Sequence, residues 1–387
     1  PLRAVIQTLT DRDALPAAVE LRLTAVAADQ VVVRADERDP LAITTGITLA
    51  GESLRRAPVR LRSRALQDAI GTTPGWSTED SGLLHVRGVD DGFLYVIDGV
   101  PVYERLDGLF GIAPDPSMID SVNIITGYVP AEFGFKSGGV IEVRSAGRHT
   151  DRWVGTGEAG GGGDDARDFS AVIGGPAGPA ALTLGAAGQA SSRFLDPVHP
   201  DNLHNDGRAF SGGAQLAWSL ASGSVLTVVA GAGRSTFDVP HGEEQEAAGQ
   251  DQRQRIGNAW QTASWQRVWT ADTVSQVAAY HRYGSSILSS SPLDTPLLSE
   301  ADRNVRRTGA LASISHQRGR HLFKAGGEAA RLRLNEGFLF AVTDEELAEE
   351  TDLSEAAVTF DADDPFTFAG SASAALFGLY VQDSMRV

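Results

Sequence analysis

The stretch HVRGVDDGFLYVIDGVPV, residues 85–102, decides how this chain is interpreted. It contains two short apolar runs, Leu83–Val89 and Phe93–Ile97, with Asp90-Asp91-Gly92 between them. An Asp-Gly pair between alternating hydrophobic residues predicts a β-hairpin, because glycine tolerates the positive φ that tight turns need. An Arg-Gly pair lies on one arm and a second Asp-Gly pair lies just beyond the other, and the hairpin alone explains neither.

Composition limits the classes of function. The chain has 387 residues and a formal net charge of −17, with 50 Asp and Glu against 33 Lys and Arg. An acidic protein is a poor nucleic-acid binder, because phosphate binding requires a basic surface, so we expect no nucleic-acid partner. There is no cysteine, which excludes disulfides and thiolate chemistry. The sequence contains no run of 18 apolar residues and therefore no predicted transmembrane helix. Membrane-spanning β-strands need only about 10 residues of alternating character each.

Residues 41–147 read as a compact α+β domain. One face of a predicted helix is apolar and ends at Gly71, followed by a Pro-Gly pair. Strands are predicted around residues 122–126 and 140–144. The apolar helical face consists of Leu61, Ala65, Leu66, Ala69 and Ile70.

Residues 148–387 change character and alternate with a period of two. In one strand Leu216 and Trp218 fall on one side and Gln215 and Ser219 on the other. Short polar connections alternate with long ones, as in an up-and-down membrane barrel with strands of about 10 residues. A soluble β-sandwich shows the same alternation, so the pattern alone leaves both architectures open. The long connections are predicted at 194–208, 238–256, 287–304 and 338–372.

The opening stretch and the segment IDSVNIITGYVPAEFGFKSGGVIEVRSAG that follows it resemble the plug domain of TonB-dependent outer-membrane receptors. The resemblance lies in the order and spacing of short motifs over some 85 residues of this chain. These motifs are Arg87-Gly88, Asp98-Gly99-Val100-Pro101, Val122, Ile124, Gly127, Ala131-Glu132-Phe133-Gly134, Gly138-Gly139, Ile141 and Val143. The AIGTTPGW stretch (69–76) is similar to the family's helix followed by Pro-Gly.

The resemblance extends to both sides of residues 41–147. Residues 28–40 resemble a TonB box and its linker, with the box-like residues Asp29, Gln30, Val31, Val32 and Val33. Residues 1–27 resemble the end of a carboxypeptidase-regulatory-like β-sandwich, an extension common in the Oar-like branch of the family. Segments 193–207 and 378–387 look like barrel segments of that branch.

The implied fold is an α+β plug domain followed by an all-β antiparallel transmembrane barrel, residues 148–387. The family barrel has 22 strands around a plugged lumen. The roughly 240 residues after the plug allow on the order of ten strands, so we expect a partial barrel and an N-terminal fragment of a receptor.

The resemblance implies that transport is driven from outside the outer membrane, which has no energy source of its own. TonB, an inner-membrane partner, pulls on a periplasmic segment of the receptor, and the exposed strand Val31–Val33 suits β-strand addition. Arg87 and Glu132 are predicted to face charged groups of the plug or the barrel wall, with Asp98 in the same signature; the alternative is that Arg87 and Asp98 pair with each other. Gly88, Gly99 and Gly134 are predicted to serve turns and close backbone approach.

Outward-facing residues of such a plug contact the ligand, and the positions here are Tyr103, Glu104 and Arg105. The implied partners are TonB, outer-membrane lipid and lipopolysaccharide, and a scarce or bulky nutrient taken up through rearrangement of the plug. The implied location is the outer membrane of a Gram-negative-type cell, with the plug in the barrel lumen and the N-terminus in the periplasm. Siderophore, cobalamin, oligosaccharide and peptide remain open as the substrate.

No catalytic constellation is present. HExxH, GxSxG and P-loop motifs are missing from the sequence, and we expect neither an enzyme nor a cofactor. His199 and His204 lie beside Asp201 and Asp206 in a loop-like stretch; a metal site is conceivable there, but the prediction is turn-forming residues and no metal. A different class of function, a soluble or surface-displayed β-rich adhesin or glycan-binding protein, requires an apolar interior between two sheets.

Overall fold

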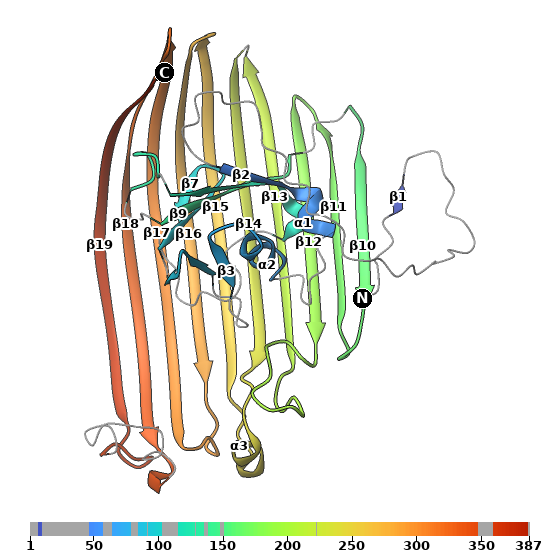
Figure 1. The fold of residues 1–387 in the computed structure, drawn as a ribbon, viewed down its shortest axis with the longest axis vertical. Coiled ribbons are helices and arrows are strands. Elements are labelled where there is room, and N and C mark those ends of the chain that lie inside the picture. Colours follow the sequence, from blue (N-terminus) through green and yellow to red (C-terminus); the bar gives the residue numbers. More distant parts are fainter. Residues whose placement is uncertain are drawn as a thin grey trace.

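The computed structural model describes two bodies, a small α+β domain and a wall of long antiparallel strands. The described residues are 7–9, 46–56, 64–78, 84–90, 92–102, 115–127, 129–134, 138–147, 151–221, 223–346 and 359–385. The small domain lies against one face of the wall, part of the way along its strands (Figure 1). This arrangement agrees with the predicted order of an α+β domain followed by an antiparallel β structure.

A five-stranded sheet forms the centre of the small domain, in the order β2-β8-β9-β6-β7. Helices α1 (Gly51–Arg56) and α2 (Ala65–Gly71) pack on this sheet. Their side chains Leu54, Leu66 and Ile70 join apolar side chains of the strands in one buried core. Helix α2 confirms the predicted apolar helical face for Ala65, Leu66, Ala69 and Ile70, whereas Leu61 lies outside the described residues. The strands are β2 (Gly46–Ala50), β6 (Phe93–Ile97), β7 (Val100–Val102), β8 (Ile119–Thr126) and β9 (Gly139–Ser145).

A second, three-stranded sheet contains β3 (Trp76–Thr78), β4 (Leu84–Val86) and β5 (Val89–Asp90). The hairpin predicted around Asp90-Asp91-Gly92 is wrong. β4 pairs with β5 across Arg87-Gly88, and β6 pairs with β7 across Asp98-Gly99. β6 also pairs in parallel with β9, a long-range contact that separates it from β4. The Arg-Gly and Asp-Gly pairs are thus themselves the turns of two tight hairpins.

Both turns have positive φ at both central residues. The φ angles are 52° and 74° at Arg87-Gly88, and 51° and 81° at Asp98-Gly99. Two-residue turns of this kind match the right-handed twist of the flanking strands, and they favour glycine at the second position. This local requirement accounts for the glycine in each pair.

In the described part of the chain the wall has ten strands, β10 to β19, and the short β1 (Gln7–Leu9) adds an eleventh at the β10 edge. Each strand pairs antiparallel with its neighbour in sequence. The number of strands predicted from chain length is confirmed. The strands are β10 (Val154–Gly161), β11 (Arg167–Ala177), β12 (Ala180–Ser191), β13 (Gly207–Ala221), β14 (Ser224–Asp238), β15 (Arg253–Thr270), β16 (Thr273–Ser289), β17 (Leu297–Arg318), β18 (His321–Val342) and β19 (Phe366–Met385).

The two faces of the wall differ, as period-two alternation requires. In β11, Phe169 and Ile173 are exposed while Ser170 and Val172 are buried. In β19, Leu379 is 94% exposed. Apolar side chains thus point away from the small domain, and no second sheet packs over them in the described part of the chain. This is the reverse of a sandwich core, so the adhesin alternative receives no support from the fold.

Short turns join the strands at one end of the wall and long connections join them at the other (Figure 1). A short helix, α3 (Glu243–Ala248), lies in one long connection. The connection predicted at 287–304 is wrong in extent, because β16 runs to Ser289 and β17 starts at Leu297. The predicted strand length of about 10 residues is also too short, since β17 and β18 have 22 residues each. No helix among the described residues has the length and hydropathy of a membrane span.

Candidate functional site

The Asp98-Gly99 turn lies where the small domain meets the wall. The Asp98 carboxylate accepts hydrogen bonds from the Ser145 amide (2.8 Å) and the Ser145 hydroxyl (2.7 Å), which tie the turn to the end of β9. Burial raises the pKa of Asp98, and the two Ser145 hydrogen bonds and the nearby Arg144 and Arg282 oppose that rise. Asp98 therefore holds the turn through neutral hydrogen-bond donors.

Arg87 does not pair with Asp98, the alternative considered from the sequence. Its side chain is exposed and lies over Gly127, where an added Cβ would be 3.0 Å from Arg87 Nη2. The Arg87 amide donates to the Gly75 carbonyl at 2.8 Å. An added Cβ at Gly88 would meet nothing within 4 Å, so its positive φ is the feature that requires glycine there.

The wall contacts the β6–β7 hairpin through Arg307, which is completely buried. Arg307 Nη1 donates to the Pro101 carbonyl at 2.9 Å, and Nη2 forms an ion pair with Glu328. The Tyr280 hydroxyl donates to the same Glu328, and the Arg307 guanidinium lies 5.2 Å from the centre of the Tyr280 ring. Three adjacent strands, β16, β17 and β18, thus supply one buried Tyr–Arg–Glu cluster.

An apolar contact accompanies this cluster. Val100 packs against Tyr280 and Ala330 of the wall. An added Cβ on Gly99 would lie 3.3 Å from Gln276 Nε2, so the turn is close to β16. Sequence reasoning missed these wall residues, because inward-facing polar side chains recur along every strand of a barrel and nothing local distinguishes Arg307.

A second contact joins the loop after β8 to the last two strands. Glu132 forms an ion pair with Lys324 of β18 at 3.0 Å, and the Ala131 amide donates to Gln382 Oε1 of β19 at 2.9 Å. Lys324 and Gln382 are register partners in the wall. Gly134 makes no close approach, since an added Cβ would meet nothing within 4 Å.

A third contact lies on β12 and β13. Met118, in the 3₁₀ turn η2 (Pro116–Met118), packs against the backbone of the wall. A Cβ on Gly185 would lie 2.5 Å from Met118 Cγ, and one on Gly213 would lie 3.5 Å from its Sδ. Farther along the same side, Arg64 forms an ion pair with Asp196 at 3.1 Å. We call these three sets of contacts the seam.

Among the described residues, two groups in or beside the long connections could hold a metal ion. One contains His199, Asp201 and Glu243, and the other His204, Asp238 and Asp251. Two predicted sites lie outside the described residues, namely the box-like Asp29–Val33 and the ligand positions Tyr103, Glu104 and Arg105. The strand proposed at 19–27 also lies outside them.

Comparisons with known proteins identify the small domain. Residues 41–140 match the family model of the TonB-dependent Receptor Plug Domain. A search of curated protein sequences found no match. The family and the solved structures that follow are receptors and transporters rather than enzymes, which agrees with the expectation that this chain is not one.

Solved structures share the fold at low identity. The copper transporter OprC superposes with a TM-score of 0.67 at 15% identity, covering 92% of this chain and 54% of its own. FpvA of Pseudomonas aeruginosa, bound to a ferric pyoverdine, gives 0.66 at 14%, covering 90% and 50%. The ferric yersiniabactin uptake receptor FyuA of Yersinia pestis gives 0.59 at 12%, covering 88% and 62%. The chain thus spans between half and two thirds of these receptors.

Proposed function

We propose that this chain is the plug and part of the barrel of a TonB-dependent outer-membrane receptor that imports a scarce or bulky nutrient by energy-coupled rearrangement of the plug. The observation that carries the proposal is the match of residues 41–140 to the plug family, combined with the seating of that domain against one face of a long-stranded wall. The other face of the wall exposes apolar side chains such as Phe377 and Leu379, which suits contact with lipid.

Energy coupling requires a segment outside the wall that a partner can bind and pull, and we call the proposed segment, Val31–Val33, the handle. Val31–Val33 is a β-branched run followed by a polar linker, which a partner can bind by adding it to a sheet edge. The handle precedes β2, and β2 is an edge strand of the small-domain sheet as far as the described residues show, paired with β8. A pull from the N-terminal side therefore acts first on one edge strand.

The seam has the properties of a releasable attachment. Glu132–Lys324 and Arg64–Asp196 are partly exposed ion pairs, which give specific contacts of modest strength. The Arg307 cluster binds a backbone carbonyl rather than a side chain, so the plug can leave without stranding a charge of its own. Arg307 keeps its partner Glu328 within the wall after such a departure.

The finer assignments extend this proposal. The Oar-like branch, with a carboxypeptidase-regulatory-like extension over residues 1–27, is supported by sequence resemblance. Tyr103, Glu104 and Arg105 are the proposed ligand contacts, and lipopolysaccharide is a proposed neighbour of the long connections. The plug lies in the barrel lumen and the N-terminus is periplasmic. Two of the similar structures are a ferric yersiniabactin uptake receptor and a copper transporter, which favours a metal or metal chelate as cargo.

The coupling handle provides the sharpest test, since it needs no knowledge of the nutrient. Val32→Pro removes a backbone donor from the added strand, and we expect it to weaken binding of the isolated TonB periplasmic domain by more than about tenfold, measured by calorimetry in detergent. Ala35→Pro, in the linker beyond the box, is the matched control and should change binding by less than about twofold. Equal binding of both variants, or no binding by the wild type, overturns the proposal.

A further inference from the structure

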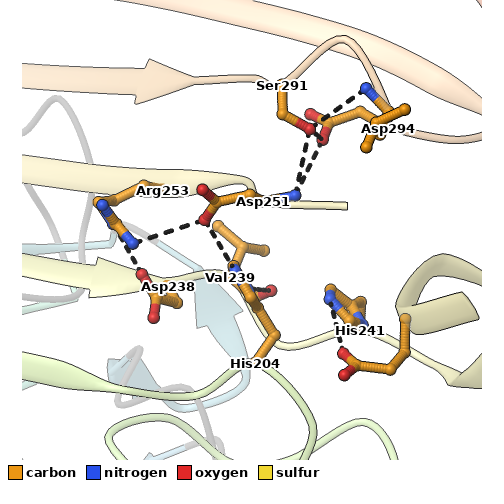
Figure 2. A network of polar contacts seen from close by, with 10 residues as sticks. His204, Asp238, Val239, His241, Asp251, Arg253, Ser291 and Asp294 are labelled. Carbon is orange, nitrogen blue, oxygen red and sulfur yellow. Dashed lines mark hydrogen bonds and ion pairs between the residues drawn. The ribbon is translucent and has the colours of Figure 1, made fainter. Parts of the chain in front are cut away.

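The connection 192–206 and the connection 239–252 meet at His204, whose two ring nitrogens both face oxygen acceptors (Figure 2). Nδ1 lies 3.1 Å from the Val239 carbonyl oxygen, and Nε2 lies 3.1 Å from Asp251 Oδ1. Neither a carbonyl nor a carboxylate donates a proton, and a neutral imidazole carries only one N–H. A neutral imidazole that donates from Nδ1 to the Val239 carbonyl therefore directs the lone pair of Nε2 toward the Asp251 carboxylate, as a metal ligand would.

His199, in the same connection, differs, because each of its ring nitrogens faces a partner that suits a neutral imidazole. Its Nδ1 accepts a hydrogen bond from the Asp201 amide at 3.3 Å, which leaves the Nε2 proton for Glu243 Oε1, also at 3.3 Å. One neutral tautomer satisfies both contacts. The side chains of Asp201 and Glu243 are 79% and 76% exposed, so this first group behaves as an ordinary solvated pair. His199 is thus a matched control for His204.

The arrangement at His204 is that of a metal ligand. Ligating histidines usually donate the second ring N–H to a backbone carbonyl, as Nδ1 does here to Val239. The ligand atoms of His204, Asp238 and Asp251 all lie within 4.8 Å of one another. The 3.1 Å between His204 Nε2 and Asp251 Oδ1 is close to the spacing of about 3.3 Å that two ligands have on a tetrahedral zinc ion.

A second imidazole supports this assignment. His241 stacks on His204 with 4.8 Å between ring centres and is only 3% exposed. Its Nδ1 faces the Gly242 carbonyl, and its buried Nε2 has no hydrogen-bond partner. Glu246 Oε2, at 3.6 Å, is beyond hydrogen-bonding distance. Two adjacent imidazoles therefore both present Nε2 toward carboxylates.

Arg253 competes for the same carboxylates. Its Nε donates to Asp238 Oδ1 at 2.7 Å, and its Nη2 lies 3.5 Å from Asp251 Oδ1. The Arg253 side chain is 49% exposed, so it can turn into solvent with the loss of only a surface ion pair, which contributes little to stability. A divalent ion replaces that single charge with two.

We infer that His204, Asp238 and Asp251 form a binding site for a divalent first-row transition ion such as Zn²⁺, which staples the two connections together at the end of the wall opposite the short turns. Imidazole with carboxylate is a donor set that suits zinc, copper and nickel. The site is independent of energy coupling and of the handle at residues 31–33, so it stands or falls separately from the proposed transport.

The test is a zinc titration of the chelator-stripped protein in detergent, followed by calorimetry, with Cu²⁺ electron paramagnetic resonance to detect nitrogen ligands. We expect one ion per chain, and a loss in affinity of about tenfold or more in His204→Asn and in Asp251→Asn. His199→Asn should bind as the wild type does. Arg253→Gln should bind zinc more tightly, because the competing guanidinium is gone.

Three results overturn the assignment. The first is no zinc binding by the wild type at neutral pH. The second is equal loss in His199→Asn and His204→Asn, which indicates adventitious surface binding. The third is weaker binding in Arg253→Gln, which indicates that the guanidinium supports the carboxylates rather than competing for them.

Discussion

Arg307 of the wall donates a hydrogen bond to the main-chain carbonyl of Pro101 in the small domain, across 206 residues of sequence. The same guanidinium is paired with Glu328, so the wall brings its own counter-ion to the contact. This hydrogen bond, together with the packing of Val100 on Tyr280 and Ala330, holds the β6–β7 hairpin against the wall.

Arg307→Met should loosen the hairpin and destabilise the wall locally. It leaves the Glu328 carboxylate, 12% exposed, without its cation, a loss of about 3–5 kcal/mol for a buried pair. The double variant Arg307→Met/Glu328→Gln should recover most of the wall stability but not the contact with Pro101. Hydrogen exchange of the β6 and β7 amides measures the seating, and unchanged protection in Arg307→Met contradicts this account.

Asp98 variants should separate hydrogen bonding from charge. Asp98→Asn keeps an acceptor for Ser145 and tolerates φ of 51°, so we expect stability at neutral pH equal to or above the wild type. Asp98→Ala loses both hydrogen bonds at a positive φ and should cost about 1–3 kcal/mol. Denaturant unfolding of the small domain compares the stability of the two variants with that of the wild type. Equal destabilisation by Asn and Ala would mean that the charge itself holds the turn.

The pH dependence of Asp98 follows from the direction of its pKa. Because burial raises the pKa above the unfolded value, the folded state binds this proton more tightly. The contribution of Asp98 to stability is then greatest below the unfolded pKa of 3.8, and it declines as the pH rises through the raised folded value. Stability measured from acid to neutral pH should lose this decline in Asp98→Asn and keep it in Glu132→Gln.

Gly185→Ala should disturb the seam at Met118. A Cβ there would lie 2.5 Å from Met118 Cγ, closer than van der Waals contact allows. Met118→Ala in the same chain should relieve the clash, so a double-mutant cycle should show coupling of about 1 kcal/mol or more. Gly163→Ala, where an added Cβ meets nothing within 4 Å, is the neutral control. Additive effects of the two seam changes would exclude the packing contact.

Exchanging the charges of Glu132 and Lys324 should restore the resistance to proteolysis that either single substitution removes. Glu132→Lys places like charges together and should speed limited proteolysis of the small domain, while Glu132→Lys/Lys324→Glu should return to the wild-type rate. The expected coupling is about 1 kcal/mol and should shrink at high salt, because both side chains are partly exposed. Coupling that is unaffected by salt would point to a shape change rather than an ion pair.

Elements whose formation depends on a regular repeat of apolar and polar residues could be predicted from the sequence. Alternation along residues 148–387 predicted antiparallel strands, the length of this segment predicted their approximate number, and the apolar face from Ala65 to Ile70 predicted α2. Sequence reasoning failed at the opening stretch, where three X-Gly pairs compete for the turn. The choice between them depends on the parallel pairing of β6 with β9, more than 40 residues away, which no local pattern records.

The amino-acid sequence by itself determined the order of the two bodies, the alternation of side chains along the strands and the glycine in the Arg87-Gly88 and Asp98-Gly99 turns, because these depend on side-chain alternation and backbone φ within a few residues. Only the tertiary structure decided that Arg307 meets Pro101, that Glu132 meets Lys324 and that His204 lies between Val239 and Asp251. These partners come from strands and loops far apart in the chain, and the register of the wall and the seating of the small domain set their distances.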